Sequence, residues 1–383
     1  MATDEEVYRA QRDLKSDDPE TRIAALQLLG RDGRPSIFWG VREALKDAKI
    51  EVHDEASHAL VQIRDRRIEE LSDPDFWVRS KAIWELTHMC TTDPWIKSFL
   101  GIETANVGGD EALNALIARL DPAIETEIFT RCQVINALKE IGDTRSIEPL
   151  LRSLNPKYEP EWSVRSMAAD ALGWFNYSSW LQAIRVVKSL LRTLAREKEA
   201  PLSADAADSL GNIRHPLAAP ALISRVNWRR EHRASVRSSS ALALGKVEIK
   251  PGFWKWIAVR ALTGALRDED AGVREYAALS LGNIGDAKPV KHLMRMLDPK
   301  KEPNGRVRSL VASSLGKLGD ERAVDALRRT AGVDTDYFTR VEAQRALVSI
   351  LEASALRADE DSRSRSRFFG KAAGAVRAVL AVQ

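Results

Sequence analysis

One phrase recurs along the chain and constrains its fold more than any other feature. It is clearest at residues 271–286 (AGVREYAALSLGNIGD) and returns at residues 305–320 as GRVRSLVASSLGKLGD. An arginine followed seven residues later by a leucine marks eight copies: Arg22/Leu29, Arg79/Leu86, Arg131/Leu138, Arg165/Leu172, Arg237/Leu244, Arg274/Leu281, Arg308/Leu315 and Arg340/Leu347. Two further copies carry histidine or serine in place of the arginine, at His53/Leu60 and Ser203/Leu210. The steps between anchors are 31, 26, 52, 34, 38, 34, 37, 34 and 32 residues, a spacing typical of stacked helical repeats.

Each copy has the pattern of an amphipathic helix. In the copy at Arg274 the apolar positions are Val273, Ala277, Leu281 and Ile284, which are three or four residues apart and form one stripe. A glycine in the slot after the leucine lets neighbouring helices approach, and the following Gly-Asp ends the helix. A second helix is expected next, as at residues 287–297, and no sustained period-two pattern indicates a strand. The sequence therefore predicts an all-α fold, an α-solenoid of about ten helical hairpins that bury their apolar stripes against one another.

The motif VRxxAAxALGxIGD, seen best at residues 273–286 and 307–320, resembles the HEAT-like repeat family, in the short subtype named after phycobilisome lyases. The resemblance extends over roughly residues 14–352. It implies that the arginine-bearing helices form the inner, concave wall of the solenoid. Because solenoids of this kind serve unrelated tasks, the resemblance implies a fold more strongly than a function.

We expect residues 1–352 to form a single solenoid with insertions near 88–111, 173–201 and 247–266. Residues 353–383 are expected to contain a flexible linker and then a basic amphipathic helix, because five basic and no acidic residues follow from Arg363 onward. Two interpretations of this tail stay open: a terminal cap or docked helix, and a segment that binds a partner or a membrane surface.

The composition points to a cytoplasmic protein without a membrane anchor. No apolar run approaches the ~20 residues that span a bilayer, and the acidic N-terminus lacks the apolar region of a secretory signal. The two cysteines, Cys90 and Cys132, lie far apart and fit a reducing compartment.

The sequence favours a protein without a catalytic site, metal or cofactor. None of the six histidines is followed by glutamate, unlike the iron-binding His-Glu pairs of deoxyhypusine hydroxylase, which has similar repeats. His53 and His58 are five residues apart and point to different helix faces, so they do not match a metal pair on one face. Phosphate-binding glycine loops and nucleophile motifs are missing. A phycobilin-lyase-like enzyme or a chromophore carrier stays an alternative, because the repeats do not reveal that activity.

A binding surface can be placed from helical geometry. Residues five and nine positions after the arginine lie opposite the apolar stripe, and their chemistry varies from copy to copy. The candidates for contact with a partner are Trp84, His88, Asn136, Asp170, Trp174, Asp208, Asn212 and Asn283. Large aromatic side chains often anchor interfaces, although these indoles could instead pack beneath the insertions. We therefore expect a non-enzymatic scaffold or adaptor that binds a protein along its concave surface; its oligomeric state is open.

Positive charge is concentrated in residues 214–260, where ten basic and two acidic residues give a net charge of +8. The candidates for binding a polyanion there are Trp228, Arg229, Arg230, Arg233, Lys250, Trp254, Lys255 and Trp256. Such cations could neutralise the phosphates of a nucleic acid while the indoles stack on its bases, or they could bind an acidic protein segment. Alternatively, Arg237 serves the repeat and the other charges are solvated. For the repeat arginines themselves we expect a ladder of Arg–Asp pairs that links adjacent turns.

Overall fold

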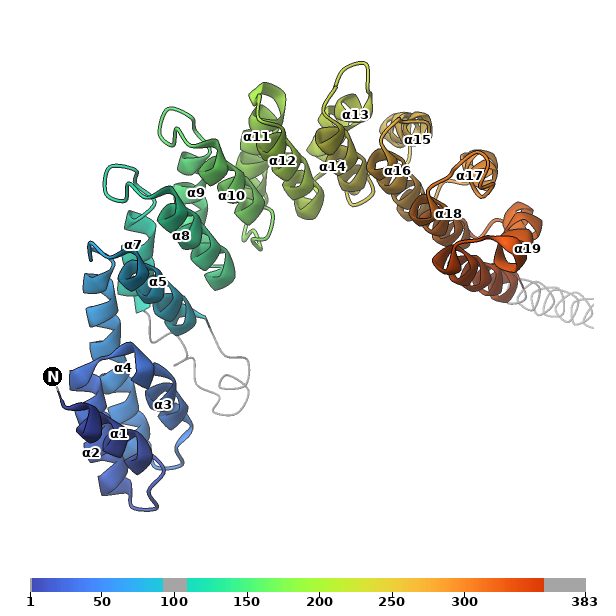
Figure 1. Cartoon of the computed structure of the whole chain (residues 1–383). Coiled ribbons are helices and arrows are strands. Elements are labelled where there is room, and N and C mark those ends of the chain that lie inside the picture. The colour runs from blue at the N-terminus through green and yellow to red at the C-terminus, as the bar shows by residue number, and fades with distance from the viewer. Residues whose placement is uncertain (1, 92–108, 355–383) are drawn as a thin grey trace, which may run out of the picture. The chain divides into compact units, whose positions relative to one another are not determined.

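The chain folds as an all-α solenoid (Figure 1). The computed structural model describes residues 2–91 and 109–354, and within those ranges every regular element is a helix. The contacts divide the chain into two compact units, Met1–Ser189 and Leu190–Gln383. The boundary falls within α11 (Trp180–Arg196).

Unit 1 begins with α1 (Asp4–Asp13) and continues with helices of very different length. Its further helices are α2 (Pro19–Asp32), α3 (Phe38–Glu43), α4 (Ile50–Glu70), α5 (Phe76–Cys90), α7 (Gly109–Ala118), α8 (Ile128–Ile141), α9 (Ile147–Ser153) and α10 (Trp162–Leu172). The anchor residues of the repeat lie on α2, α4, α5, α8 and α10.

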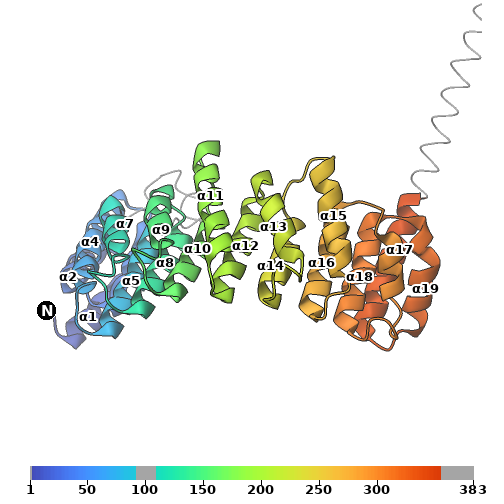
Figure 2. The ribbon, with the colours of Figure 1, turned by 90° about the horizontal axis from the view of Figure 1, so that it is seen from above.

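Unit 2 is more regular, and its helices alternate between two layers (Figures 1 and 2). The layer that carries the repeat anchors contains α12 (Ala200–Ile213), α14 (Ala234–Leu244), α16 (Ala271–Ile284) and α18 (Gly305–Leu318). The other layer contains α13 (Ala219–Val226), α15 (Phe253–Ala265), α17 (Val290–Met296) and α19 (Val324–Val333). Residues 337–354 continue as a helix that holds the last anchor, Arg340.

Helix α16 illustrates how the sequence specifies each anchor helix. The Asp270 side chain accepts a hydrogen bond from the backbone N–H of Val273 at the helix start. Gly285 ends the helix in the left-handed conformation, with φ of 69°, where a side chain would be strained. Val273, Ala277 and Leu281 are fully buried between these ends. The predicted apolar stripe is therefore the core-facing side of the helix.

Glycines bring successive anchor helices of unit 2 into direct contact. A Cβ atom on Gly282 would lie 2.9 Å from the Cα atom of Ser314 on α18, and Gly211 and Gly316 face Ala243 and Ala346 in the same way. Because the anchor helices touch through their backbones, their layer is shorter than the opposite one. Unit 2 consequently curves with α12, α14, α16 and α18 on its inner side (Figure 1). We call these helices the inner layer and α13, α15, α17 and α19 the outer layer.

The repeat arginines form a buried ladder between consecutive turns. The guanidinium of Arg237 donates two hydrogen bonds of 2.8 Å to the carboxylate of Asp268, and it also donates to the backbone oxygen of Glu231 at 3.1 Å. The next arginine, Arg274, donates to the backbone oxygen of Asp268 at 2.8 Å. The remaining carboxylate pairs of the ladder are Arg22–Asp47, Arg79–Glu125, Arg131–Glu159, Arg274–Glu302 and Arg308–Asp334. The predicted ladder is confirmed, with glutamate in place of aspartate in three of its rungs.

The sequence irregularities have distinct structural forms. The step of 26 residues between His53 and Arg79 holds the 21-residue helix α4 and a turn, so this copy has no separate second helix. Within the predicted insertion at 173–201 lies the long helix α11. Within 247–266, residues 253–265 form α15, the outer helix of its repeat, and the irregular part is the connection before it.

Parts of two further predictions lie outside the described residues. These are positions 92–108 of the insertion near 88–111, and positions 355–383 of the tail. Among the described helices, none combines the length and the apolar character that a membrane-spanning segment needs.

Candidate partner-binding surfaces

All eight residues predicted for the partner surface have solvent-accessible side chains. In unit 1, Trp84 is 46% exposed and Trp174 is 61% exposed, so neither indole is part of the core. Asn136 is exposed, whereas His88 and Asp170 are half-buried. These five residues come from α5, α8, α10 and the residues just after α10, and α8 packs against both α5 and α10. We call this surface the three-helix face.

The Trp84 side chain is held in place by other rings. The ring of His88, one helical turn later on α5, lies 4.3 Å from it, and Trp39 of α3 contacts both rings at 5.8 and 5.6 Å between centroids. The Nδ1 atom of His88 lies 2.7 Å from the backbone oxygen of Trp84, which fixes the imidazole. Trp39 is itself 50% exposed, so the cluster of three rings is accessible from solvent.

The Trp174 side chain is fixed by a different set of contacts. Its Nε1–H donates to the carboxylate of Asp170 at 3.2 Å, and the Lys139 ammonium lies 4.8 Å from the ring centroid. Lys139 also forms an ion pair of 2.6 Å with Asp170. A cation over the ring and a hydrogen bond at its edge restrict the indole while its other face stays exposed.

In unit 2 the predicted surface residues are engaged in polar pairs between neighbouring inner helices. The Ser239 hydroxyl donates to Asp208, and the lysines Lys246 and Lys317 donate to Asn212 and Asn283, at 2.8 to 2.9 Å. These pairs link one repeat to the next and leave this face polar. The exposed indoles of the predicted partner surface are therefore in unit 1.

The structure divides the predicted polyanion-binding residues into three groups, of which Arg233 is the first. Its guanidinium forms an ion pair with Glu231 and donates to the backbone oxygens of Glu197 and Lys198 and to the hydroxyl of Ser203. A repeat arginine donates to one or both of the equivalent backbone oxygens in its own copy, as Arg237 does to Glu231 and His232, but this copy has Ser203 in the arginine position. Arg233 thus replaces the missing repeat arginine, and its role is structural.

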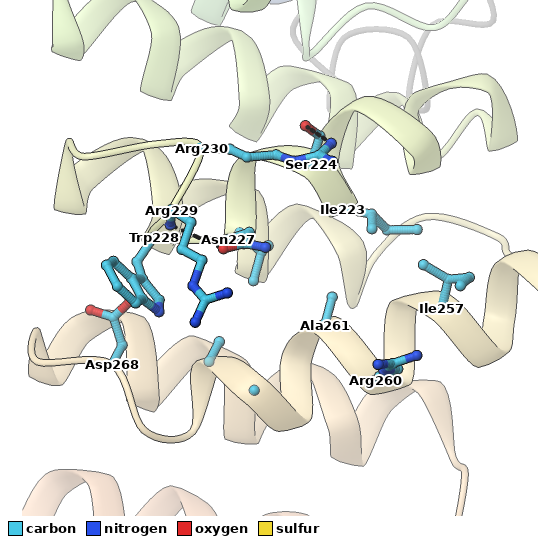
Figure 3. A pocket seen from close by; sticks show the side chains of 13 residues that line it. Ile223, Ser224, Asn227, Trp228, Arg229, Arg230, Ile257, Arg260, Ala261 and Asp268 are labelled. Carbon is cyan, nitrogen blue, oxygen red and sulfur yellow. Dashed lines mark hydrogen bonds between the residues drawn. The ribbon is translucent and has the colours of Figure 1, made fainter.

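Trp228, Arg229 and Arg230 form the second group and line a groove between α13 and α15 with a volume of about 530 Å³ (Figure 3). Trp228 and Arg229 extend from the turn after α13 towards α15, and the Arg229 guanidinium lies 5.4 Å from the centroid of the Trp228 ring. Arg230 lies beside Ser224, at 3.5 Å from its hydroxyl. Arg260 of α15 lines the same groove.

Lys250, Trp254, Lys255 and Trp256 form the third group, at and just before the start of α15. Both indoles are about half exposed, and Trp256 lies 5.6 Å from the guanidinium of Arg260. This group therefore connects to the groove through Arg260.

Sequence reasoning did not single out three residues of these surfaces: Trp39, Lys139 and Arg260. Trp39 lies in a short second helix rather than an anchor helix, and no pattern in the sequence places it beside Trp84. Lys139 could have been found, because it precedes Glu140, which is nine residues after Arg131 and therefore in a predicted surface position. Arg260 is one of the ten basic residues of the region 214–260 and could have been added to the candidates from its position one helical turn after Trp256.

The thiols and one phenol are weakly acidic. Burial raises the pKa of the Cys90 thiol to about 11, and burial also raises the pKa of Cys132, so both stay protonated near neutral pH. Burial raises the pKa of Tyr177 as well. Within residues 2–91 and 109–354, no group of three or more His, Cys, Asp and Glu side chains could hold a metal ion.

Comparisons with known proteins bear on the fold. The family model of HEAT repeats matches residues 259–348, and that of the PBS lyase HEAT-like repeat matches residues 130–156. No curated protein matches the chain.

Among solved structures, Kap121p bound to Ste12p is similar with a TM-score of 0.54 and 14% identity, over 92% of this chain and 46% of that chain. Kap95p in a structure with RanGDP has a TM-score of 0.51 and 15% identity, over 90% of this chain and 50% of that chain. This chain therefore spans about half the length of these two proteins. Human deoxyhypusine hydroxylase is similar over 98% of its length but with a TM-score of 0.33, which is too low to compare sites. The chain therefore has an all-α solenoid fold, and the family models identify HEAT-like repeats within it at residues 130–156 and 259–348.

Proposed function

We propose that this chain is a non-enzymatic scaffold that binds a protein partner through the three-helix face of unit 1. The observation that carries the proposal is the pair of exposed, restrained indoles, Trp84 and Trp174, on two repeats that flank the repeat of α8. An indole fixed before binding loses little conformational freedom in the complex, so more of its burial appears as affinity. Tryptophan is accordingly among the residues that contribute most to protein interfaces.

The polar residues between the two indoles support specific recognition. Asn136 and Glu140 are exposed on α8, which packs between α5 and α10. An amide and a carboxylate flanked by two aromatic anchors give a surface with an apolar contact at each end and hydrogen-bonding groups in the middle. This composition is common at protein interfaces, where aromatic anchors are surrounded by polar groups. The solved structures of similar fold offer weaker support: Kap121p is described as bound to Ste12p, and Kap95p as binding RanGDP.

The test uses the tagged full-length chain to recover partners from the native lysate, followed by calorimetric titration of each recovered protein. Trp84→Ala and Trp174→Ala are each expected to weaken binding by about thirtyfold or more, the loss typical of an interface anchor. Trp254→Ala is the matched control, because Trp254 is an indole of similar exposure, 48% against 46% for Trp84, but lies on α15 of unit 2.

The proposal would be wrong if the recovered partner bound both variants as tightly as the unsubstituted chain. It would also be wrong if Trp254→Ala weakened binding as much as Trp84→Ala, since the loss would then not be specific to the three-helix face. Circular dichroism of each variant checks that the helices are intact.

A further inference from the structure

The outer layer of unit 2 contains two neighbouring grooves. Close contact between the inner helices leaves the outer helices further apart, and each groove lies between two of them. The α13–α15 groove and the α15–α17 groove each have a volume of about 530 Å³, and Asp268 lines both. They are consecutive along the solenoid and lie on either side of α15.

Six cationic side chains line these grooves without a carboxylate partner among the described residues. They are Arg229, Arg230 and Arg260 in the α13–α15 groove and Arg267, Arg295 and Lys301 in the α15–α17 groove. All six are exposed. By contrast, Arg225 and Arg237 of the same unit each form an ion pair. The positive charge of this region is therefore left uncompensated at the grooves.

The two carboxylates at the grooves do not neutralise these cations. Asp268 accepts hydrogen bonds from Nε and Nη2 of Arg237, and Glu302 accepts two from Arg274, at 2.7 and 3.0 Å. Both belong to the repeat ladder and are buried. An anion that enters the grooves thus meets cations that have no carboxylate partner and carboxylates that are already paired.

Between the cations, the grooves are lined by aliphatic groups. In the α13–α15 groove these include Ile223, Ile257 and Ala261 (Figure 3). In the α15–α17 groove they include Leu266 and Met296. The α13–α15 groove also contains Gly264, where a Cβ atom would meet nothing within 4 Å. Gly264 therefore leaves space that a side chain of a ligand can fill.

We propose that the two grooves bind an extended acidic peptide, whose carboxylates pair with the six cations and whose aliphatic side chains enter the space between them. Guanidinium groups bind carboxylates through two parallel hydrogen bonds, and clusters of arginine are a recurring means of binding acidic segments. Two of the arginines are already positioned by tryptophans, Arg229 by Trp228 and Arg260 by Trp256. This second surface is on the outer layer of unit 2 and is independent of the three-helix face.

The lining favours a peptide over a nucleic acid. Binding of single strands relies on a series of aromatic rings on which successive bases stack. Trp228 is the one tryptophan, tyrosine or phenylalanine side chain that lines either groove in the described part of the chain, and the other apolar contacts are aliphatic. Aliphatic groups accommodate Leu, Ile or Val side chains and offer no stacking surface to a base.

The test measures fluorescence anisotropy of a labelled synthetic peptide of Asp-Glu-Leu repeats on titration with the full-length chain. A peptide of Asn-Gln-Leu repeats and an oligothymidylate of similar length are titrated in parallel. The acidic peptide is expected to bind, more weakly as salt rises, and the uncharged peptide is not. Arg229→Gln, Arg260→Gln and Arg295→Gln should each weaken binding by about tenfold, because each removes a charge-assisted contact. Arg328→Gln is the control, because Arg328 is an exposed arginine of α19 that lines neither groove.

Gly264→Leu provides a test that leaves every charge in place. The added side chain would occupy the α13–α15 groove without meeting other protein atoms near its Cβ, so it should block the peptide while the helices stay intact. Unchanged affinity in both Gly264→Leu and Arg260→Gln would overturn the proposal. It would equally be overturned if the oligothymidylate bound more tightly than the acidic peptide and lost its affinity in the same variants, since the grooves would then be a nucleic-acid surface.

Discussion

At the residue scale, six of the eight repeat arginines bind to two turns at once in the described part of the chain. In the copy at Arg237, the Nε and Nη2 atoms bind the carboxylate of the following turn, while Nη1 binds two backbone oxygens of the preceding turn. A lysine could not do this, because its single ammonium lacks the planar set of donors that reaches both turns. The ladder is therefore a specific property of arginine and explains why eight of ten copies retain it.

Loss of the buried arginine is expected to be costly. Arg237 and Asp268 have side chains that are 2% exposed, so Arg237→Met leaves a buried carboxylate without its partner. We expect the free energy of unfolding to fall by about 3–5 kcal/mol, measured by urea denaturation. Adding Asp268→Asn should restore part of it, because the amide removes the unpaired charge and still accepts from the N–H of Asp270.

An exposed pair supplies the control for this measurement. Arg322 and Asp320 form an ion pair in which the arginine side chain is 54% exposed, so Arg322→Met should change the free energy of unfolding by less than about 1 kcal/mol. Equal losses in Arg237→Met and Arg322→Met would contradict the structural role of the ladder.

The ladder also predicts a pH dependence. Burial of Asp334 would raise the pKa of its carboxyl, but hydrogen bonds from Arg308 and from the N–H of Asp336 outweigh burial and hold it below the ordinary value of 3.8. Because the unfolded chain takes up this proton first, the contribution of Asp334 to stability is complete above about pH 4 and disappears as the pH falls through the lowered pKa. Asp334→Asn should therefore destabilise the chain at neutral pH, and the difference should shrink in acid. A difference that stayed constant from pH 7 to pH 2 in denaturation experiments would argue against this pair.

At this scale the sequence predicts the recurring contacts and misses the unique ones. The ladder could be predicted because the arginine recurs at a fixed position in the repeat. The sequence could not predict that Arg233 takes the role of the arginine missing at position 203. Arg233 and Ser203 are 30 positions apart and meet only when adjacent repeats stack. The same reason hides the contact between Trp39 and Trp84.

At the scale of the helix, one slot decides how closely neighbours pack. The glycine that follows the repeat leucine faces the backbone of the next anchor helix, as Gly282 faces Ser314. Glycine lowers the intrinsic stability of a helix by about 1 kcal/mol relative to alanine, so its presence here reflects packing between helices. The helices themselves, their caps and their buried stripes follow from the local pattern and were predictable.

The same substitution at two helical glycines should have opposite effects. Gly282→Ala would place a methyl group 2.9 Å from the Cα atom of Ser314, so we expect α16 and α18 to separate and the free energy of unfolding to fall. In Gly264→Ala, on α15, the added methyl group would meet nothing within 4 Å. This variant should raise the free energy of unfolding by about 1 kcal/mol, because alanine has the higher helix propensity. Thermal denaturation of both variants checks this; a stabilised Gly282→Ala would show that the slot is not sterically closed.

The grooves could not be predicted at this scale, because they belong to no single helix. Arg229 and Arg230 stood out in the sequence as members of a basic region, whereas Arg267, Arg295 and Lys301 lie outside that region and are dispersed over 35 residues. The spacing of the outer helices brings the latter three together. The spacing depends in turn on contacts in the inner layer.

At the scale of the whole molecule, stability is distributed along the chain. In a stack of repeats each element contacts mainly its neighbours, so the unfolding free energy is approximately a sum of local terms. The contacts divide the chain into two units at residues 189 and 190, and we predict that the two units unfold separately. A single two-state transition is therefore not expected for this chain.

Hydrogen exchange with mass spectrometry can test this division. Arg67 in unit 1 is fully buried and forms an ion pair of 2.8 Å with Glu85, so Arg67→Met should lower protection in unit 1 and leave unit 2 nearly unchanged. Arg237→Met should do the reverse. Loss of protection across both units in either variant would show that the chain unfolds as one cooperative body.

The glycine contacts of the inner layer also determine how unit 2 can deform. Backbones that already touch cannot be compressed, so any bending must pivot about that layer and widen or narrow the gaps on the opposite side. The inner contacts then serve as the hinge, and the outer helices move apart or together as unit 2 bends. A ligand bound between two outer helices would therefore change the curvature of the inner layer without contacting it.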